Sequence, residues 1–597
     1  MADQFKPLDV GTDGVNVSLD AVGRLVALNF YHPEHGYATL TGIDPFPEAD
    51  RYNPQAVRAY RAALATREGF GVQLAPDIEK TEIVWLDDAI PRIRLKLANR
   101  GSAEVTTIVH EGVLYQRWTF EGVIPRFGGR VSLQRSAYTQ LTEGGPVPMP
   151  PVETAIRFDP ETLGGLLTID NPALGGAVAM FGSLQGEPIN VQTSGIARVN
   201  LALLPGDDAL FCCAAGSTVE EAVERARAAF PLTAASFTAA LNAERERWQQ
   251  RWIGVSTDRL LRRGLSYSAQ MAIPVGEGIC FLTDHMLLPL SWNRDAYYLA
   301  RALLSWTPDM HDLVRRHLIW MFEQADRPGG AWGRCYLANG QLKDAAFQLD
   351  QQLFPLLELA EYTLETDDRA TFERLRPHVG EILSHLTTRK ATNAALFATA
   401  ETPADDPIAL PYHLSSHILF WVTLRKLERL GIETGGLAGA IYDAVQRHFL
   451  ADHDGDKLYA YATDGAGKYH LYHDANDFPT VLAPVWGWCS ADDPIWRQTM
   501  TFAFSEANRE GFYNGHLGSV HTRAPWALGD VQALILARIL GDTALQGHAL
   551  DSLRFAAQPD GALPEAYDGE TGTVVSRHWF AWSNAAYACV MLDAFKP

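Results

Sequence analysis

Residues 217–230 read STVEEAVERARAAF, and the pattern of the sequence changes at this stretch. Ser217 stands where the N-cap of a helix is expected, and acidic residues occupy the first turn behind it. Before this stretch, apolar and polar residues alternate with a period of about two, whereas behind it apolar residues recur with helical spacing. Ser217 therefore separates two parts of the chain that are expected to fold differently.

The part before this point consists of short alternating runs bounded by Gly, Asp and Pro. Examples are GVNVSLDAVGRLVALNFY (14–31), TEIVWLDDAIPRIRLKLANR (81–100), VTTIVHEGVLYQRWTF (105–120) and RVSLQRSAYTQL (130–141). One segment, PQAVRAYRAALATREG (54–69), has a competing helical pattern. Many such strands in series predict an antiparallel β-sandwich over residues 1–215.

The part behind this point is helical. Residues 216–254 are expected to form a helical linker, and residues 255–597 contain roughly twelve helical segments with short loops. Antiparallel helices in this number suit a closed (α/α)6 barrel, in which inner helices are wrapped by outer ones. No fixed-period repeat supports the alternative, an open solenoid. The expected fold is thus α+β and multidomain.

The composition limits the partners. The 597 residues include 50 Lys and Arg and 71 Asp and Glu, which gives a formal charge of −21. This charge argues against a basic surface for nucleic acid and against binding to an anionic membrane. No signal peptide or membrane span is visible, and the six cysteines have no disulfide spacing, so a cytoplasmic location is expected. A chain that lacks its signal would have the same features. No feature indicates an oligomeric state.

Polar residues collect in the loops that precede the even-numbered helical segments, which would be the inner helices. The clusters are SWNRDAYY (291–298), AAFQLDQQ (345–352), AETPADDPIALPYHLSSH (400–417), YHDANDFP (472–479), GHLGSVHTRAPW (515–526) and LPEAYDGETGTVVSRHW (563–579). One acidic helix start is usually a cap. Clusters that recur at one end of a barrel predict a pocket there.

Two carboxyl groups in an aromatic pocket suit the cleavage of a glycosidic bond. One protonates the leaving oxygen, and the other activates water on the opposite face or attacks the anomeric carbon. Glu565 and the acidic group around Asp405 both belong to the pocket end but lie far apart in sequence. Carboxylates on opposite walls of a cavity are what an inverting enzyme needs. The 15 Trp, 20 Tyr and 26 Phe provide faces for sugar rings.

The layout resembles the bacterial glucoamylase family, which has a β-sandwich, a helical linker (here ending in RWQQRWIG, 247–254) and an (α/α)6 barrel. WNRDAYY (292–298) is similar to the family's Arg-Asp pair, which implies that Arg294 and Asp295 bind the non-reducing sugar. LPEAYDGETG (563–572) resembles the segment that carries the general base, and Glu565 matches it, as Trp582 and Ser583 match the Trp-Ser pair that follows. Trehalase-like and processing α-glucosidase families share the barrel and use an aspartate as the acid.

The chain departs from the glucoamylase pattern at the general acid. The family has a Trp-Glu pair before the sixth helix, whereas this chain has AETPADDP (400–407). The resemblance therefore implies Asp405 or Asp406 as the acid, with Glu401 in reserve. The pKa of the acid is expected to be raised by the apolar pocket.

The same loops supply candidate substrate-binding residues. Trp292, Arg294 and Asp295 belong to the motif that carries the resemblance and are expected to bind the terminal sugar. Gln348 and Asp350 could bind hydroxyls or cap a helix. Further candidates are His413, His473, Asp474, Asp477, His516, His521, Arg523, Arg577, His578 and Trp579. About half of these are expected to be structural. No cofactor or metal is implied, since ADHDGDKLY (451–459) lacks the spacing of a calcium loop.

The sequence is interpreted as that of an inverting, exo-acting glycoside hydrolase of the glucoamylase-like or α-glucosidase-like type. Its substrate would be an α-linked sugar at the end of an oligosaccharide or glycoside. Two alternatives stay open. A sugar epimerase on the same barrel would use two pocket histidines for proton transfer, and a non-catalytic carbohydrate-binding protein would keep the tryptophans and lose one carboxylate.

Overall fold

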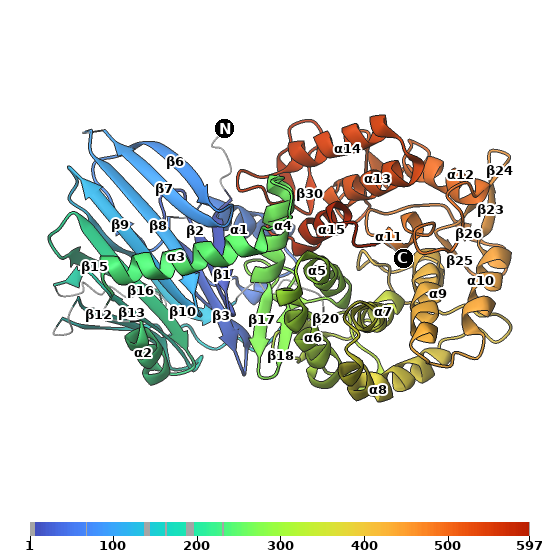
Figure 1. Cartoon of the computed structure of the whole chain (residues 1–597), viewed down its shortest axis with the longest axis horizontal. Coiled ribbons are helices and arrows are strands. Elements are labelled where there is room, and N and C mark those ends of the chain that lie inside the picture. The colour runs from blue at the N-terminus through green and yellow to red at the C-terminus, as the bar shows by residue number, and fades with distance from the viewer. Residues whose placement is uncertain are drawn as a thin grey trace. The chain divides into compact units, whose positions relative to one another are not determined.

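The computed structural model describes residues 6–66, 68–98, 100–136, 144–160, 164–186, 196–229 and 232–595. Its contacts divide the chain into two compact units. Unit 1 comprises Met1–Val275, Asp284–Pro289 and Leu337–Asn339, and unit 2 comprises Gly276–Thr283, Leu290–Tyr336 and Gly340–Pro597. Figure 1 shows the strands of unit 1 in blue to green and the helices of unit 2 in green to red.

Unit 1 is built mainly from two antiparallel sheets. The first has the order β1-β2-β3-β4-β10-β15-β14, with β5 beside β10, and the second has the order β11-β12-β13-β16-β9-β8-β7-β6. The strands of the first sheet are β1 (Leu8–Thr12), β2 (Val15–Leu19), β3 (Leu25–His32), β4 (Gly36–Thr41), β5 (Gly71–Gln73), β10 (Arg126–Arg135), β14 (Leu184–Gln185) and β15 (Ala197–Leu203). Those of the second are β6 (Ile78–Leu86), β7 (Ile90–Leu97), β8 (Ser102–His110), β9 (Val113–Glu121), β11 (Ala155–Asp159), β12 (Leu166–Asn171), β13 (Gly176–Gly182) and β16 (Asp208–Gly216).

The alternation of the strands gives the two sheets a common core. In β7, Ile93 and Leu95 are buried, whereas Arg94 and Lys96 are exposed. The buried side chains of both sheets belong to one hydrophobic cluster, to which Trp118 of β9 contributes. The prediction of an antiparallel β domain at the N-terminal side is thus confirmed. The predicted run 130–141 extends past the described residues at position 136.

The helices α2 (Val219–Ala228), α3 (Ala234–Arg251) and α4 (Arg259–Gln270) belong to unit 1, as do α1 (Pro54–Thr66) and β17 (Ala272–Val275). Helix α2 covers β13 and β16 through small residues, among them Ala222 and Ala226. The N-cap of α2 is Thr218, whose hydroxyl accepts from the Glu221 amide, so the assignment of Ser217 as the cap was wrong by one residue. The domain boundaries expected at 215 and 254 stay a prediction.

A buried charge cluster lies in unit 1 around Asp9. Its carboxylate pairs with Lys6 and, at 2.9 Å, with Arg263, and it accepts a hydrogen bond of 2.8 Å from the Ser18 hydroxyl. His285 Nε2 lies 3.3 Å from the same carboxylate. Burial alone would raise the pKa of Asp9, but Lys6, His285 and Arg263 together lower it. Asp9 is therefore charged at neutral pH and contributes to stability there.

Replacing Asp9 with asparagine is expected to destabilise unit 1 by about 3–5 kcal/mol at pH 7, because two buried cations lose their counter-charge. The folded-state pKa is depressed, so the contribution of Asp9 is present above its unfolded pKa of about 3.9 and is lost as the pH falls below it. Chemical denaturation should show a gap between variant and wild type that narrows below about pH 4. The exposed Asp13→Asn is the matched control, and a gap that does not change with pH would contradict the assignment.

Unit 2 contains a closed ring of helices. Each of α5, α7, α9, α11, α13 and α15 contacts the next, and α15 contacts α5. Their bounds are α5 (Asn293–Trp306), α7 (Leu349–Thr366), α9 (Leu414–Arg429), α11 (Phe478–Val481), α13 (Ala527–Leu540) and α15 (Ala581–Met591). These helices begin in the segments expected to be the inner ones. Nearly every residue of α7 is buried, as expected for a helix covered on all sides.

Further helices lie outside this ring in Figure 1. They are α6 (His311–Ile319), α8 (Arg369–Thr387), α10 (Leu437–His448), α12 (Pro494–Ala503) and α14 (Thr543–Ala556). Helix α11 ends at Val481, within an apolar run that continues to Trp488. Pro484 follows in the next turn and has no amide hydrogen to continue the ladder. The prediction of a helical C-terminal part is confirmed.

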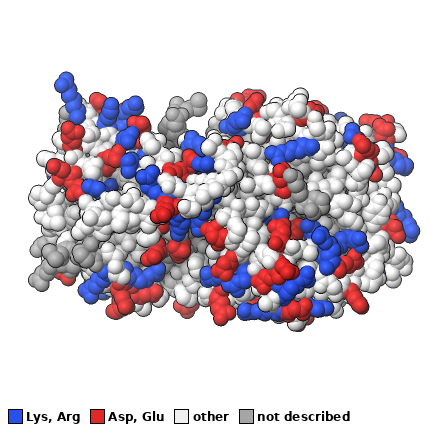
Figure 2. All heavy atoms as spheres, viewed as in Figure 1, with Lys and Arg blue, Asp and Glu red and all other residues white. Residues whose placement is uncertain are grey.

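Short strands lie in the loops of unit 2, several of them before the helices of the ring. Their bounds are β18 (Gly278–Phe281), β19 (Leu290–Ser291), β20 (Cys335–Leu337), β21 (Leu342–Asp344), β22 (Tyr412–His413), β23 (Leu450–His453), β24 (Asp456–Tyr459), β25 (Ala462–Thr463), β26 (Tyr469–His470), β27 (Phe512–Tyr513), β28 (His516–Ser519), β29 (Ala524–Pro525), β30 (Ala566–Tyr567) and β31 (Val574–Ser576). The helices in the described part of the chain include none that is long and apolar enough to cross a membrane. Acidic and basic side chains are interspersed on the face shown in Figure 2.

Candidate active site

A small pocket, partly open to solvent, lies at the N-terminal ends of the ring helices, and all its lining residues belong to unit 2. The lining residues are Trp292, Arg294, Asp295, Pro403, Ala404, Asp405, Asn476, His521, Trp526, Glu565, Arg577, Phe580 and Trp582. They come from the loops before α5, α9, α11, α13 and α15 and from the first turns of α5 and α15. The polar clusters of the sequence had indicated these segments.

Glu565 is held on one wall of this cavity by the β30–β31 hairpin. Its amide donates to the Arg577 carbonyl at 3.1 Å, and its own carbonyl accepts from the Ala527 amide at 3.1 Å. Its carboxylate accepts from the Ser576 hydroxyl at 2.5 Å and lies 3.2 Å from Arg577 Nε. Gly572 closes the hairpin at a φ of +70°, a conformation that favours glycine. The β30–β31 hairpin and its neighbours therefore fix the buried Glu565 through both its backbone and its carboxylate.

Asp405 lies on another part of the wall, in the loop before α9. Its carboxylate accepts from Gln348 Nε2 at 2.7 Å and Trp292 Nε1 at 3.1 Å, and Arg294 Nη2 lies 3.3 Å away. Burial would raise the pKa of Asp405, but the cations of Arg294 and Arg334 outweigh it and lower the pKa. The expectation that the acid has a raised pKa therefore does not describe Asp405, because two arginines face it.

Asp295 is a carboxyl group of the pocket whose pKa is raised, in contrast to that of Asp405. It accepts a short hydrogen bond from the Thr283 hydroxyl, and Arg294 Nε lies 3.8 Å from its Oδ1. Burial raises the pKa of Asp295 to about 6, although Arg294 opposes this rise. Among the described residues, Oδ1 of Asp295 has no hydrogen-bond partner. Asp295 Oδ1 is therefore a buried acceptor with unused hydrogen-bonding capacity.

Arg294 contacts residues of three ring helices, α7 and α15 besides its own α5. Its Nη1 donates to Asp350 at 2.9 Å and to Gln348 at 3.1 Å, and its guanidinium lies 5.0 Å above the Trp582 ring. Burial would lower the pKa of Arg294, but Asp350, Asp405 and Asp295 raise it further above its usual value. Arg294 is therefore charged and fixed, as recognition of planar sets of oxygens requires.

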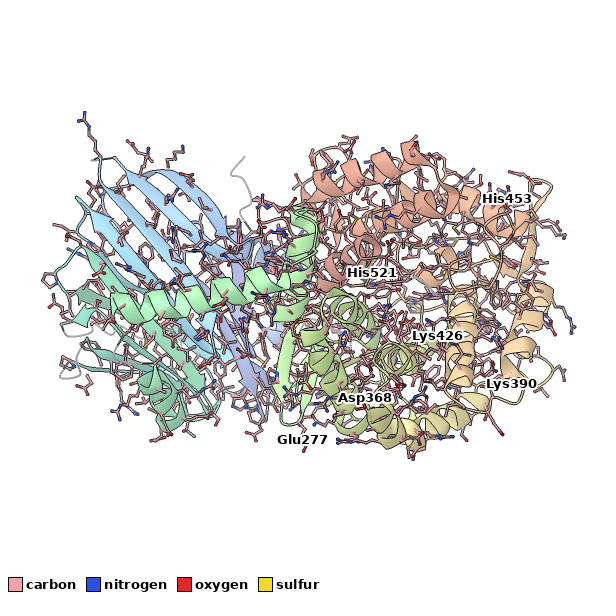
Figure 3. The ribbon with its side chains drawn as sticks, viewed as in Figure 1. Glu277, Asp368, Lys390, Lys426, His453 and His521 are labelled. Atoms are coloured by element: carbon pink, nitrogen blue, oxygen red, sulfur yellow. The ribbon has the colours of Figure 1, made fainter. Side chains whose placement is uncertain are left out.

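The rim of the pocket contains a second ion pair. His521, which is labelled in Figure 3, lies in the turn between β28 and β29. Its Nδ1 is 3.2 Å from Asp406 Oδ1. Burial would lower the pKa of His521, but Asp406 and Glu565 raise it to about 9. The side chains of His521 and Asp406 are 30% and 33% exposed, so this pair joins two loops at the mouth of the cavity. Asp406 itself is outside the lining.

The structure separates the predicted site residues into three groups. Trp292, Arg294, Asp295, Asp405, His521, Glu565 and Arg577 line the cavity, whereas Gln348, Asp350, Glu401 and Asp406 contact lining residues or their loops. The remaining candidates are His413, His473, Asp474, Asp477, His516, Arg523, His578 and Trp579, which lie outside the lining.

Most of this last group have structural partners. His413 caps α9 and lies 3.2 Å from Asp477, and His473 is 2.9 Å from Gln532. His516 pairs with Asp530, His578 with Gln558, and Trp579 is buried. Asp474 accepts from Ser519 and from Asn476, and burial together with Asp477 raises its pKa to about 6. Arg523 lies in the exposed turn next to His521.

Several lining residues were absent from the predicted site, namely Pro403, Ala404, Asn476, Trp526, Phe580 and Trp582. Trp526 and Phe580 occupy the N-caps of α13 and α15, as Trp292 does in α5. An aromatic residue directly before an inner helix was thus a readable signal. The sequence gave no such signal for Asn476, because its two neighbouring aspartates in DAND (474–477) were the more obvious polar candidates. No group of three or more His, Cys, Asp or Glu in the described ranges has a metal-binding arrangement.

The fold and pocket place this chain among the proteins that resemble (α/α)6 glycoside hydrolases. A bacterial glucoamylase complexed with acarbose aligns with a TM-score of 0.66 and 11% identity, over 99% of this chain and 95% of that one. This likeness confirms the resemblance at the level of the fold. A metal-independent α-mannosidase from Streptococcus pneumoniae, in a non-productive complex with α-1,6-mannobiose, has a TM-score of 0.49 and 20% identity over 59% of this chain and 96% of that chain.

Residues 355–592 match a family model described as metal-independent α-mannosidase (GH125). The Meiotically up-regulated gene 157 protein of Schizosaccharomyces pombe is 27% identical over 222 residues, which is 34% of this chain and 43% of that protein. The match thus spans less than half the length of this curated relative. The segment matched by the family model contains both Asp405 and Glu565. These matches support a glycoside hydrolase.

Proposed function

We propose that this protein is an inverting, exo-acting glycoside hydrolase that releases a terminal α-mannosyl residue from an oligosaccharide or glycoside. The observation that carries the proposal is that the α-mannosidase family model spans the segment in which Asp405 and Glu565 line one cavity. The family match replaces the glucose preference that the glucoamylase resemblance had implied. We take the sheets of unit 1 as a β-sandwich and the helices of unit 2 as an (α/α)6 barrel.

Glu565 is the proposed general base. Ser576 and Arg577 bind its carboxylate and hold it in one orientation, so that it can accept a proton from water. The water oxygen attacks the anomeric carbon as the bond to the leaving oxygen breaks. Because the water approaches from the face opposite the leaving group, the configuration inverts.

Asp405 is the proposed general acid, which gives its proton to the leaving oxygen. Its carboxyl group lines the cavity, whereas Asp406 and Glu401 lie outside the lining. Without a substrate, Arg294 and Arg334 outweigh burial and keep its pKa low. Entry of a glycoside displaces water from the carboxylate, which favours the protonated form needed for catalysis.

Arg294, Asp295 and Trp582 form the proposed binding site for the terminal sugar. Asp295 lines the cavity and accepts a hydrogen bond from a sugar hydroxyl, and Asp350 fixes the arginine. Trp582 packs against the guanidinium of Arg294 and completes the lining. The small cavity suits one sugar, which supports exo action. His521 is the lining histidine in the described structure, so the pair of histidines that an epimerase needs has no support here.

Changing Arg294 to lysine is expected to reduce kcat/KM by about 10- to 100-fold. A lysine keeps the charge but loses the planar fork that contacts Asp350 and Gln348, and hydrogen bonds to charged groups contribute about 1.5–3 kcal/mol each. Steady-state kinetics on an α-mannoside would measure the change. Arg425→Lys on the exposed face of α9 is the control, and equal activity of Arg294→Lys and wild type would remove Arg294 from the site.

The proposed substrate class is tested with a panel of α-linked mannobioses, maltose, and aryl α-mannosides and α-glucosides. Free mannose is expected from the mannosides, with little glucose from maltose. Release of glucose at equal or greater kcat/KM would overturn the choice of sugar while leaving the chemistry intact. Binding of mannobiose without hydrolysis would favour the carbohydrate-binding alternative.

A further inference from the structure

Arg334 is a buried cation that does not line the cavity yet contacts the loop of the proposed acid. It precedes β20 and faces β21, where its amide donates to the Asp344 carbonyl at 2.8 Å. One end of its guanidinium, Nη2, pairs with the Asp344 carboxylate. The β20–β21 hairpin therefore fixes the direction in which the rest of this side chain extends.

The other end of the guanidinium, Nη1, reaches the 401–406 loop. It donates to Glu401 Oε2 at 3.1 Å and to the backbone carbonyl of Asp405 at 3.4 Å. Gln348 completes the bridge, since its Nε2 donates to Glu401 at 3.0 Å and to the Asp405 carboxylate at 2.7 Å. One buried arginine and one buried amide thus connect Glu401 and Asp405 to elements outside the loop.

The loop requires such support because Asp405 has an unusual backbone. Its φ is +64°, in the left-handed region that costs most residues free energy and is common at functional sites. Within the loop, the Asp405 amide donates to the Thr402 carbonyl at 3.0 Å, and the Thr402 amide donates to the Asp406 carbonyl at 2.8 Å. The contact of Arg334 with the Asp405 carbonyl adds a restraint from outside at the strained residue itself.

We propose that Arg334 is a positioning residue, and that with Glu401 as its partner it holds Asp405 in place and sets the electrostatic environment of the proposed acid. This inference rests on the proposed role of Asp405. It gives Glu401 a role as a counter-charge to Arg334 in place of a reserve acid. Arg334 acts through Asp405 and touches no substrate.

The charges around Asp405 agree with this role. The groups that face it are Arg294, Asp295 and Asp350 from α5 and α7, Arg334, Cys335 and Asp344 from the β20–β21 hairpin, Glu401 from its own loop, and His521 from the β28–β29 turn. After burial, which raises the pKa of Asp405, the main causes are Arg294 and then Arg334, which lower it. Burial raises the pKa of Glu401, and Arg334 opposes that rise.

The test is a pair of charge changes of opposite sign. Arg334→Gln removes a cation near Asp405. It is expected to move upward, by about 1 pH unit, the limb of the kcat–pH profile that reports Asp405 in the enzyme–substrate complex. Glu401→Gln removes an anion from the same loop and should move that limb downward. A purely structural role would reduce activity in both variants without moving the limb in opposite directions.

The limb is identified first. It is the limb that disappears in Asp405→Asn when an activated aryl α-mannoside is the substrate. If no limb disappears, the proposed role of Asp405 fails. If the limb is identified but neither variant moves it, or both move it the same way, the role of Arg334 fails alone. Arg334→Lys, which keeps the charge, should retain the limb near its wild-type position, and the exposed Arg374→Gln should match wild type.

Discussion

Replacing Glu565 with glutamine is expected to reduce kcat by about 1,000-fold or more, since a positioned general base contributes roughly 10²- to 10⁴-fold. Glutamine has nearly the shape of glutamate and can still accept from the Ser576 hydroxyl, but it cannot take a proton from water. The loss should be similar for disaccharides and for aryl glycosides, because water must be activated for both. Steady-state kinetics with both substrates would measure it.

The control for this variant lies in the same hairpin. Glu570 is exposed at the hairpin turn and lies outside the cavity lining, so Glu570→Gln should retain wild-type kinetics. Thermal unfolding of both variants establishes that the fold is intact. Activity of Glu565→Gln within tenfold of wild type would remove Glu565 from the role of base.

Asp405→Asn is expected to lose activity in a way that depends on the leaving group. For a disaccharide, kcat should fall by about 10²- to 10⁴-fold, because the sugar leaving group needs the proton that Asp405 supplies. For a dinitrophenyl α-mannoside, whose leaving group departs as a stable anion, the loss should be much smaller. The ratio of the two losses is the measured quantity.

The neighbouring residue provides the matched control. Asp406 pairs with His521 at the rim and lies outside the lining, so Asp406→Asn should show a small loss that is equal for both substrates. If Asp406→Asn shows the leaving-group dependence instead, the acid is Asp406. An equal loss for both substrates in Asp405→Asn would mean that Asp405 binds sugar without donating a proton.

Local periodicity explains why much of the fold was predictable. The alternation in segments such as 81–100 and the helical spacing after residue 216 depend on neighbours in sequence, and both gave the correct element type. The helix starts were also readable, because polar or aromatic caps precede the ring helices. The turn that presents Glu565 was identifiable from its glycines and its place before the last helix.

Features that depend on distant residues were not predictable. The low pKa of Asp405 arises from Arg294 and Arg334, which are far from it in sequence and have no motif in common with it. Arg334 was missed for the same reason, since its role follows from contacts with Asp344 and Glu401 across three loops. The grouping of α4 with the β-rich unit likewise depends on packing and not on its helical pattern.

The identity of the sugar that the enzyme would release was the other feature that local sequence patterns could not indicate. The motifs around Arg294 and Glu565 are short and describe the chemistry of a glycosidic bond, whereas the choice between two hexoses depends on a few hydroxyl contacts. The family match, which names α-mannosidases, covers residues 355–592 and therefore excludes Arg294 and Asp295. The proposed contacts of the terminal sugar with this pair thus stand on the geometry of the pocket and on the resemblance of WNRDAYY to the glucoamylase motif.

The central claim is that Glu565 and Asp405 act as a base and an acid on opposite sides of the sugar. It is tested most directly by proton NMR of the first sugar released from an α-linked mannoside, recorded before mutarotation. The account predicts β-mannose as the first product, with no release in Glu565→Gln. α-Mannose as the first product would contradict it, because retention requires a covalent intermediate and a nucleophile in place of a general base.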